Sequence, residues 1–279
     1  MTIDKPVHAF SRGYLIALCS SAILSTTAIF IRYLTQTYQL PALVLAFWRD
    51  IFVFLTLLLV FIFLQKRLLI AGTRNLGFLA LYGLGLAMFN ALWTLSVALN
   101  GAAVATVLVY CSAAFTALLG WWILKERLDW GKILAILFCL SGCVLVAGVL
   151  SPNAWSSNLI GIATGILSGL GYAIYSLMGR AASQRGINPW TTLFYTFGFA
   201  ALFLLVLNLV PSASLPGKAA QITDFFWLGR EWTGWGILFL LAALPTVAGF
   251  GLYNVSLGYL SASVANLILT TEPVFTAVS

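Results

Sequence analysis

The chain alternates between long apolar runs and short polar or Gly/Pro-containing breaks. A transmembrane helix needs about 20 consecutive, mainly apolar residues, and nine runs reach roughly that length. Their connections are short except for residues 211–233, where we expect a small interfacial helix. The pattern predicts membrane-spanning helices at residues 13–33, 43–64, 75–98, 102–124, 131–150, 158–181, 190–210, 234–257 and 261–279.

The composition indicates whether these helices lie in water or in a membrane. Hydrophobic residues make up 62% of the 279-residue chain and charged residues only 8%, whereas soluble domains carry about 25% charged residues. The chain has too little polar surface to fold in water, so we interpret it as an all-α integral membrane protein. The net charge of +7 then bears on orientation, because no basic cluster is interleaved with aromatic residues as in nucleic-acid-binding proteins.

Lys and Arg are divided unevenly between the two sets of loops. With the N-terminus inside, the cytoplasmic segments hold ten of them, whereas the external loops hold Lys218 and Arg230. Cytoplasmic loops of membrane proteins carry an excess of Lys and Arg, so the N-terminus is predicted to be cytoplasmic. The first apolar run is too long for a cleaved signal peptide and is predicted to be a permanent span.

The chain also contains an internal repeat. When residues 96–119 are placed over 256–279, seven of 24 positions are identical. Both blocks straddle a charge-free turn, but the first turn falls outside the membrane and the second inside, so the halves are inverted. Inverted repeats are typical of secondary transporters, which bind substrate near the midplane. We predict a ten-helix (5+5) fold with repeats at 1–150 and 151–279, the second incomplete, so that nine spans and no tenth helix are present.

Three stretches resemble parts of one transporter superfamily. Residues 46–55 (AFWRDIFVFL), 117–148 (which include LKERLDW) and 270–278 (TTEPVFTAV) are similar to an arginine-bearing second helix, a G-x-x-x-L-x-E-R-L loop and a Glu-Pro motif. These features are those of the EamA branch of the drug/metabolite transporter superfamily, ten-helix bacterial exporters. The aromatic-rich helices look most like the YddG-type exporters of aromatic amino acids. One departure is Ser112-Ala113 in the first repeat, where the second has Glu272-Pro273.

The resemblance implies a multi-pass protein of the bacterial inner membrane, with the lipid bilayer and a small-molecule substrate as its partners. A monomer is the default expectation, and no nucleic-acid partner is expected. The sequence gives little support for ATP hydrolysis or enzymatic catalysis. The chain has no phosphate-binding P-loop, and its one histidine, His8, lies in the N-terminal tail. We therefore predict no enzyme activity, cofactor or metal site. The cysteines lie in apolar runs, where they behave as small hydrophobes: Cys19, Cys111, Cys139 and Cys143.

Aromatic and small polar residues recur on single faces of several predicted spans. At 100° per residue, Tyr82 and Trp93 share one stripe of the third span. Together such stripes could line a cavity suited to a neutral or zwitterionic, partly apolar substrate, and unsuited to sugar phosphates, which need several cationic donors. The alternative, an interfacial aromatic belt, is equally open for Tyr82 and Tyr175. The predicted substrate-binding residues are Tyr82, Trp93, Tyr110, Tyr172, Tyr175, Tyr253, Asn266 and Thr270.

Two groups of charged residues lie within predicted spans. Arg49, Asp50 and Arg32 fall toward the outer helix ends, where they either snorkel to the lipid headgroups, the favoured reading, or ring an external mouth that meets the substrate. Glu272 falls near the midplane, where an ionisable group is a functional candidate by default. It could couple transport to protons, contact a substrate amine, or form a structural bond, and the last is favoured because its helical phase points away from Asn266 and Thr270.

Two prolines interrupt predicted spans, Pro245 in the eighth and Pro273 in the ninth. Both remove backbone hydrogen bonds, so they are candidate hinges or simply shape the cavity. The reading as a whole is a secondary transporter that exports small amphipathic metabolites, most plausibly aromatic or other neutral amino acids, by alternating access. The alternatives are a multidrug exporter of aromatic cations and, from another class, a membrane scaffold or intramembrane enzyme.

Overall fold

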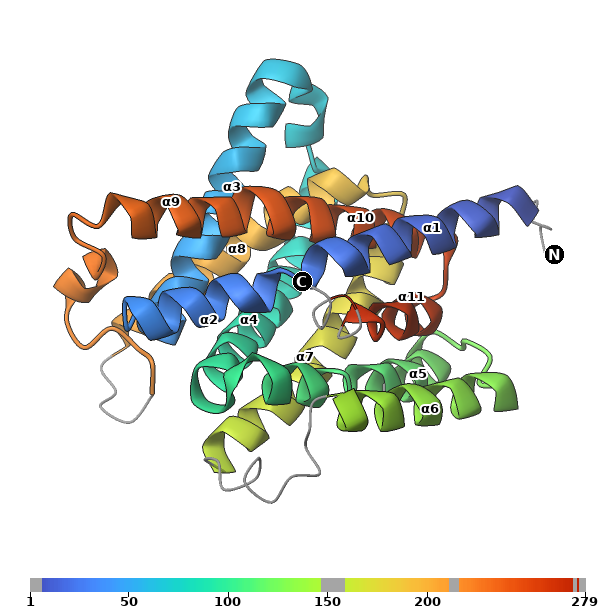
Figure 1. Cartoon of the computed structure of the whole chain (residues 1–279). Coiled ribbons are helices and arrows are strands. Elements are labelled where there is room, and N and C mark those ends of the chain that lie inside the picture. The colour runs from blue at the N-terminus through green and yellow to red at the C-terminus, as the bar shows by residue number, and fades with distance from the viewer. Residues whose placement is uncertain (1–6, 147–158, 211–215, 273–274, 276–279) are drawn as a thin grey trace.

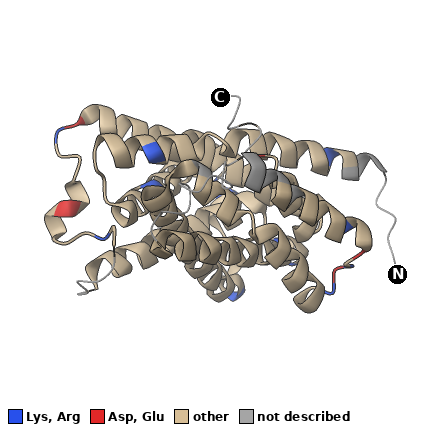
Figure 2. Ribbon diagram, turned by 60° about the horizontal axis from the view of Figure 1, so that its bottom comes forward, with Lys and Arg blue, Asp and Glu red and all other residues tan. Residues whose placement is uncertain are grey.

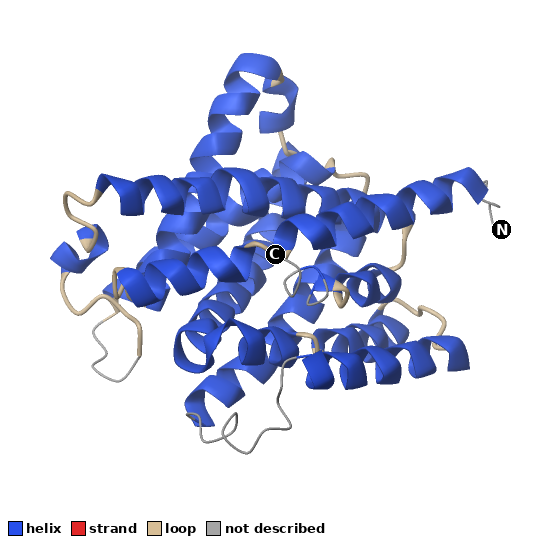
Figure 3. Ribbon diagram, in the orientation of Figure 1, coloured by secondary structure: helices blue, strands red, loops and turns tan. Residues whose placement is uncertain are grey.

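The computed structural model describes residues 7–146, 159–210, 216–272 and 275, and these residues form helices, turns and loops without strands (Figure 3). The longer helices pack into one bundle (Figure 1). Their bounds are α1 Val7–Leu24, α2 Thr27–Thr37, α3 Ala42–Leu64, α4 Gly72–Val109, α5 Ser112–Ile123, α6 Trp130–Val146, α7 Leu159–Gln184, α8 Pro189–Leu209, α9 Trp232–Leu241, α10 Val247–Tyr259 and α11 Ala262–Leu269. Three short elements are η1 Lys66–Leu69, η3 Ile222–Phe226 and the π-turn η4 Ala242–Thr246.

Seven segments within the described residues are long and apolar enough to cross a membrane, which confirms a multi-pass helical protein. The predicted spans at 131–150 and 261–279 are not among them. They correspond to α6, which has 17 residues, and α11, which has 8, and the rest of each lies largely outside the described residues. The seven segments are Ser11–Thr37, Ala42–Leu64, Gly72–Ala102, Val104–Ile123, Leu159–Gln184, Pro189–Leu209 and Trp232–Tyr259.

The first and the eighth predicted spans are each divided into two helices. The first divides into α1 and α2 at Ser25 and Thr26, whose hydroxyls donate to the carbonyls of Ala22 and Ile23 at 2.7 and 2.9 Å. Such side-chain bonds compete with the helical ladder. The eighth divides at η4, where Pro245 lacks the N–H that a regular helix needs. The broken spans are neighbours, because α1 packs on α10 and α2 on α9 (Figure 1).

The third predicted span and the first part of the fourth form one element, α4, with a sharp bend at Gly101, and the fourth span continues as α5 after a turn at Tyr110 and Cys111. The φ of Gly101, +79°, lies in the region that side-chain-bearing residues avoid, so a glycine permits this tight reversal. The turn carries no charge, as the repeat alignment predicts.

The interhelical loops gather at two opposite ends of the bundle. At one, which we call the basic end, the 65–71 loop accepts hydrogen bonds from Thr191 and Tyr195 of α8, and the 124–130 loop meets the start of α11. At the opposite end, Trp227 donates to the Tyr38 carbonyl, and Leu43 bonds to Gly217. Figure 2 shows how few ribbon positions carry a charge. Loops at two opposite ends of the bundle are what the argument from loop charge requires. The cytoplasmic location of the basic end stays a prediction.

Gly83 of α4 lies at a close contact between α4 and α8. A Cβ at this position would lie 2.4 Å from Phe199 Cβ and 3.0 Å from the backbone oxygen of Thr196. Gly83→Ala is therefore expected to destabilise the protein by roughly 1–3 kcal/mol, since the backbone of α8 cannot give way. Thermal unfolding of the purified protein, followed by loss of the monodisperse peak, measures this.

The matched control is Gly85→Ala, two residues along the same helix. The nearest atom to a Cβ there is Ile174 Cγ2 at 3.6 Å, an ordinary contact. The unfolding temperature of this variant is expected to equal or slightly exceed that of the unchanged protein. Equal losses in the two variants would contradict the proposed backbone contact.

Candidate functional site

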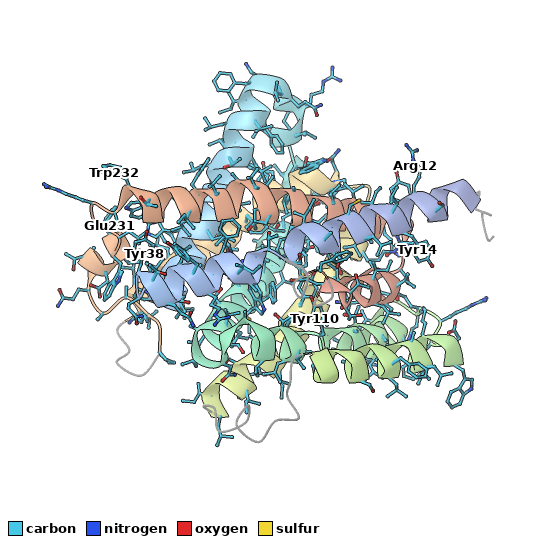
Figure 4. The ribbon with its side chains drawn as sticks, viewed as in Figure 1. Arg12, Tyr14, Tyr38, Tyr110, Glu231 and Trp232 are labelled. Atoms are coloured by element: carbon cyan, nitrogen blue, oxygen red, sulfur yellow. The ribbon has the colours of Figure 1, made fainter. Side chains whose placement is uncertain are left out.

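A small cavity, with a volume of about 40 Å³, lies where the divided first and eighth spans meet the central helices. Figure 4 places Tyr110, one of its wall residues, near the middle of the bundle, away from Arg12 and Tyr38 toward its two ends. The wall combines aromatic rings, aliphatic side chains and two ionisable groups of opposite sign. Its residues are Leu24, Thr27, Arg49, Phe89, Trp93, Thr106, Val109, Tyr110, Tyr172, Phe250, Leu269 and Glu272.

The aromatic part of the wall comes from α4, α7 and α10. The Phe89 ring lies 4.9 Å from that of Tyr172 and 6.1 Å, stacked, from that of Trp93. The Tyr172 and Phe250 rings meet at a steep angle, with their centroids 6.4 Å apart. Rings held in this way by their neighbours present fixed faces and edges to the cavity, and a bound apolar or aromatic group would meet a preformed surface.

Arg49 of α3 brings a buried positive charge to the same wall. Its side chain is 1% exposed, and its Nε donates to Asp50 Oδ1 at 3.3 Å. Asn90 of α4 donates to both Asp50 oxygens, at 2.9 and 2.7 Å. Burial of a charge is tolerated only when it is paired and hydrogen-bonded, and these three residues satisfy that condition for the carboxylate. The favoured sequence interpretation, snorkelling to the headgroups, is wrong for Arg49 and Asp50, because both are enclosed by protein.

Arg32, in contrast, is exposed on α2 and donates from Nε to Gln36 at 3.3 Å. It does not line the cavity. The sequence could not separate Arg32 from Arg49, because both lie a similar distance along apolar helices and only the packing of α3 against α4 encloses the second.

Glu272 adds the acidic group of the wall. It follows α11, is partly buried and is hydrogen-bonded to Tyr110, in the turn between α4 and α5. The helical-phase argument placed Glu272 on a different face from Asn266 and Thr270. The structure also separates them. However, Glu272 lines the cavity, whereas Asn266 and Thr270, which were expected to line it, do not. The Thr270 hydroxyl instead donates to the Leu267 carbonyl at 2.6 Å.

Four of the predicted site residues lie beside the cavity, in a buried set of hydrogen bonds that we call the inner network. Tyr253 donates to Ser176 at 2.6 Å, and the Asn266 amide donates to Ser176 at 3.2 Å and to Thr116 at 3.0 Å. Ser112 donates to Asn266 at 3.0 Å, and Tyr175 and Tyr82 make longer contacts with the Asn254 oxygen, at 3.2 and 3.5 Å. Tyr82 and Tyr175 are fully buried, so an exposed interfacial belt does not describe them. The inner network comprises Tyr82, Ser112, Thr116, Tyr175, Ser176, Tyr253, Asn254 and Asn266.

The inner network lies between the cavity and the basic end. Counted from the basic end, Tyr82 precedes Phe89 along α4, and Asn254 precedes Phe250 along α10. The same order holds on α7, where Tyr175 is nearer that end than Tyr172. Three helices thus agree that these hydrogen bonds close the cavity toward the basic end.

Glu126, from the loop between α5 and α6, completes this closure. Its Oε1 accepts the backbone N–H of Ala262 at 3.0 Å, and its Oε2 accepts that of Ser263 at 3.4 Å and the Ser263 hydroxyl at 2.5 Å. The first backbone donors of a helix have no partner within it, and a carboxylate there also meets the positive end of the helix dipole. Glu126 therefore ties a first-half loop to the start of α11 in the second half.

The other predicted residues fall in several places. Pro245 lies in the π-turn η4, and Pro273 lies outside the described residues. Cys19 and Cys111 have free thiols, and the side chains of Cys139 and Cys143 lie outside the described ones. Sequence reasoning missed several functional candidates, although an intramembrane Asn or Glu is itself a signal. These are Thr27, Asn90, Glu126, Phe250 and Asn254.

Comparison with known sequences identifies the relatives of the chain. Residues 11–148 and 159–279 match the EamA-like transporter family. An uncharacterized transporter of Archaeoglobus fulgidus is 29% identical over 196 residues, which cover 68% of this chain and 63% of that protein. The uncharacterized transporter YyaM of Bacillus subtilis is 25% identical over 207 residues, 73% of this chain and 62% of that protein. The chain thus spans less than two thirds of the length of these curated relatives.

Among solved structures, one protein crystal structure shares the fold with a TM-score of 0.69. The alignment covers 96% of this chain and 87% of the other at 15% sequence identity. At that identity the likeness concerns the fold alone.

Proposed function

This chain belongs to the EamA-like transporter family, and from that premise we propose that it exports aromatic or other neutral amino acids across a bacterial inner membrane. Its relatives are described as transporters, which indicates transport rather than an enzymatic reaction. The proposed mechanism is alternating access between two inverted repeats, residues 1–150 and 151–279. The N-terminus and the basic end would face the cytoplasm.

The cavity wall is the observation that carries the choice of substrate. Rings of Phe89, Trp93, Tyr110, Tyr172 and Phe250 surround a space that also meets one arginine and one glutamate. An amino acid with an apolar side chain matches this inventory, since it offers one carboxylate, one ammonium group and an apolar body. An ammonium group is also favoured over aromatic faces.

The mechanism follows from where the closure lies. The inner network and the Glu126 contact bar the cavity from the basic end, so substrate from that side can enter only when these hydrogen bonds separate. Export would then require them to re-form behind the substrate. Each individual bond is weak in net terms, and the set can open without prohibitive cost when the helices move together.

A multidrug exporter of aromatic cations is the second candidate, and the position of Glu272 on the cavity wall favours it. Against it stands Arg49, 1% exposed on the same wall, which would repel a purely cationic substrate at short range. A zwitterion satisfies both charges, so we place the amino acid first.

Flux into proteoliposomes tests this function. Liposomes that contain the full-length protein are expected to accumulate labelled tryptophan and phenylalanine faster than empty liposomes, with a quaternary aromatic cation moving at the background rate. The amino acids are expected to move because their carboxylate can pair with Arg49 of the cavity wall, and the quaternary cation has no such group. Cation flux without amino-acid flux would instead establish the multidrug alternative.

The role of Glu272 is separated in the same assay by Glu272→Gln, measured with and without a pH gradient. Retained flux that no longer responds to the gradient would assign proton coupling to Glu272. A poorly folded, inactive variant would assign it the structural bond with Tyr110.

A further inference from the structure

Three hydrogen-bond donors in the cavity wall lack partners among the described residues. They are Arg49 Nη2, Trp93 Nε1 and Thr27 Oγ1, each from a side chain at least nine-tenths buried. A buried donor without an acceptor costs about 1–3 kcal/mol, and more when it is charged. Buried polar atoms without a partner also occur elsewhere among the described residues, for example in Thr94 and Asn100, but these three donors share the wall of one cavity.

The chemistry of the three groups points to an acceptor. A guanidinium and an indole N–H can only donate, and a threonine hydroxyl can donate as well as accept. A ligand group that only accepts hydrogen bonds matches all three donors in kind, and an ionised carboxylate is such a group. A ligand amine would do the reverse, because it would add further donors to this wall.

Asp50 does not compete for this role. Its Oδ1 already accepts from Arg49 and Asn90, and its Oδ2 accepts from Asn90. The bond to Arg49 uses Nε, which fixes the guanidinium plane and leaves the terminal nitrogen Nη2 of this wall residue without a partner among the described residues. Asp50 and Asn90 are thus positioning residues that hold Arg49 for a ligand.

We propose that Arg49, Trp93 and Thr27 form a carboxylate-binding subsite of the cavity, specific for small carboxylates that carry an aromatic or apolar body. The subsite deepens the proposed amino-acid transport, on which the identity of the natural ligand rests. The subsite can also be tested independently of that function, because it requires a carboxylate on the ligand whether or not the ligand carries an amine.

Isothermal titration of the purified full-length protein with three indole compounds tests the subsite. Tryptophan has both charged groups, indole-3-propionate only the carboxylate, and tryptamine only the amine. Loss of the hydrogen bonds to a charged carboxylate is expected to weaken tryptamine relative to tryptophan roughly 10- to 100-fold. Indole-3-propionate is expected to bind more tightly than tryptamine, by the larger part of the same factor.

Three variants assign the effect to residues. Trp93→Phe removes the indole N–H but keeps a ring, and Thr27→Val removes the hydroxyl at nearly constant volume. Each is expected to reduce the ratio of tryptophan to tryptamine affinity several-fold, and Arg49→Gln to bring it near one. Arg32→Gln, at an exposed arginine outside the cavity, is the control and should leave the ratio unchanged. If Arg49→Gln does not fold, the two conservative variants decide.

The outcomes separate the subsite from the proposed function. Equal affinity for tryptophan and tryptamine in the unchanged protein overturns the subsite, even if liposome flux of amino acids is observed. Binding of indole-3-propionate that depends on Trp93 and Thr27, without binding or flux of any amino acid, upholds the subsite and removes the proposed substrate. Absence of binding by every carboxylate probe overturns the subsite.

Discussion

Replacing Asp50 with alanine is expected to lower the unfolding temperature of the purified protein by roughly 5–10 °C, because an unpaired buried charge costs about 3–5 kcal/mol. The substitution leaves Arg49 enclosed with no counter-charge among the described residues within salt-bridge distance. It also strands the Asn90 amide nitrogen, which donates to both carboxylate oxygens of Asp50. Thermal unfolding in detergent, read by size-exclusion fluorescence, measures the loss.

Two controls separate pairing from simple truncation. The double variant Arg49→Met with Asp50→Leu removes both charges and is expected to recover much of the lost stability, as neutral replacement of buried pairs often does. Asp129→Ala removes an exposed carboxylate and should change the unfolding temperature little. An Asp50→Ala protein as stable as the unchanged one would mean that Arg49 does not need its partner.

Replacing Glu126 with alanine is expected to release the start of α11. The backbone N–H groups of Ala262 and Ser263 lose the acceptor that joins them to the 124–130 loop. Loss of hydrogen bonds to a charged group is worth about 1.5–3 kcal/mol, so amide exchange of the α11 peptide should accelerate roughly tenfold or more. Hydrogen exchange with mass spectrometry on the reconstituted protein measures the change directly.

Asp129→Ala provides the matched control, from the same loop. Asp129 accepts the backbone N–H of Lys132 at 2.8 Å and so caps α6 rather than α11. Faster exchange is expected at the start of α6 and none at α11. Faster exchange of α11 in both variants would show that the loop as a whole, and not the Glu126 carboxylate, holds the helix.

The membrane character and most of the spans could be predicted because each depends on a local apolar run. The cavity aromatics Trp93 and Tyr172 could be found in the same way, since helical periodicity assigns residues of one helix to one face. The breaks at Ser25–Thr26 and at η4 were harder to foresee, because Ser, Thr and Pro also occur in unbroken membrane helices.

What could not be predicted depends on which helices touch. Asp50 lies 40 residues from Asn90, and Glu126 lies 136 residues from Ala262, so no local pattern links either pair. The burial of Arg49 could not be predicted from a local pattern either. Its position near a helix end suggested contact with water, and only the packing of α3 against α4 turns it inward.

The adjacency of Arg49 and Asp50 has an electrical consequence. An elementary charge moved through the whole membrane field changes its energy by about 2.3 kcal/mol per 100 mV. The two opposite charges are consecutive residues at nearly one depth, so the field exerts almost no net force on α3 when that helix moves. A zwitterionic ligand adds no net charge either. If Glu272, a carboxyl group on the cavity wall, is ionised, it would be the group through which membrane voltage acts on the loaded cavity.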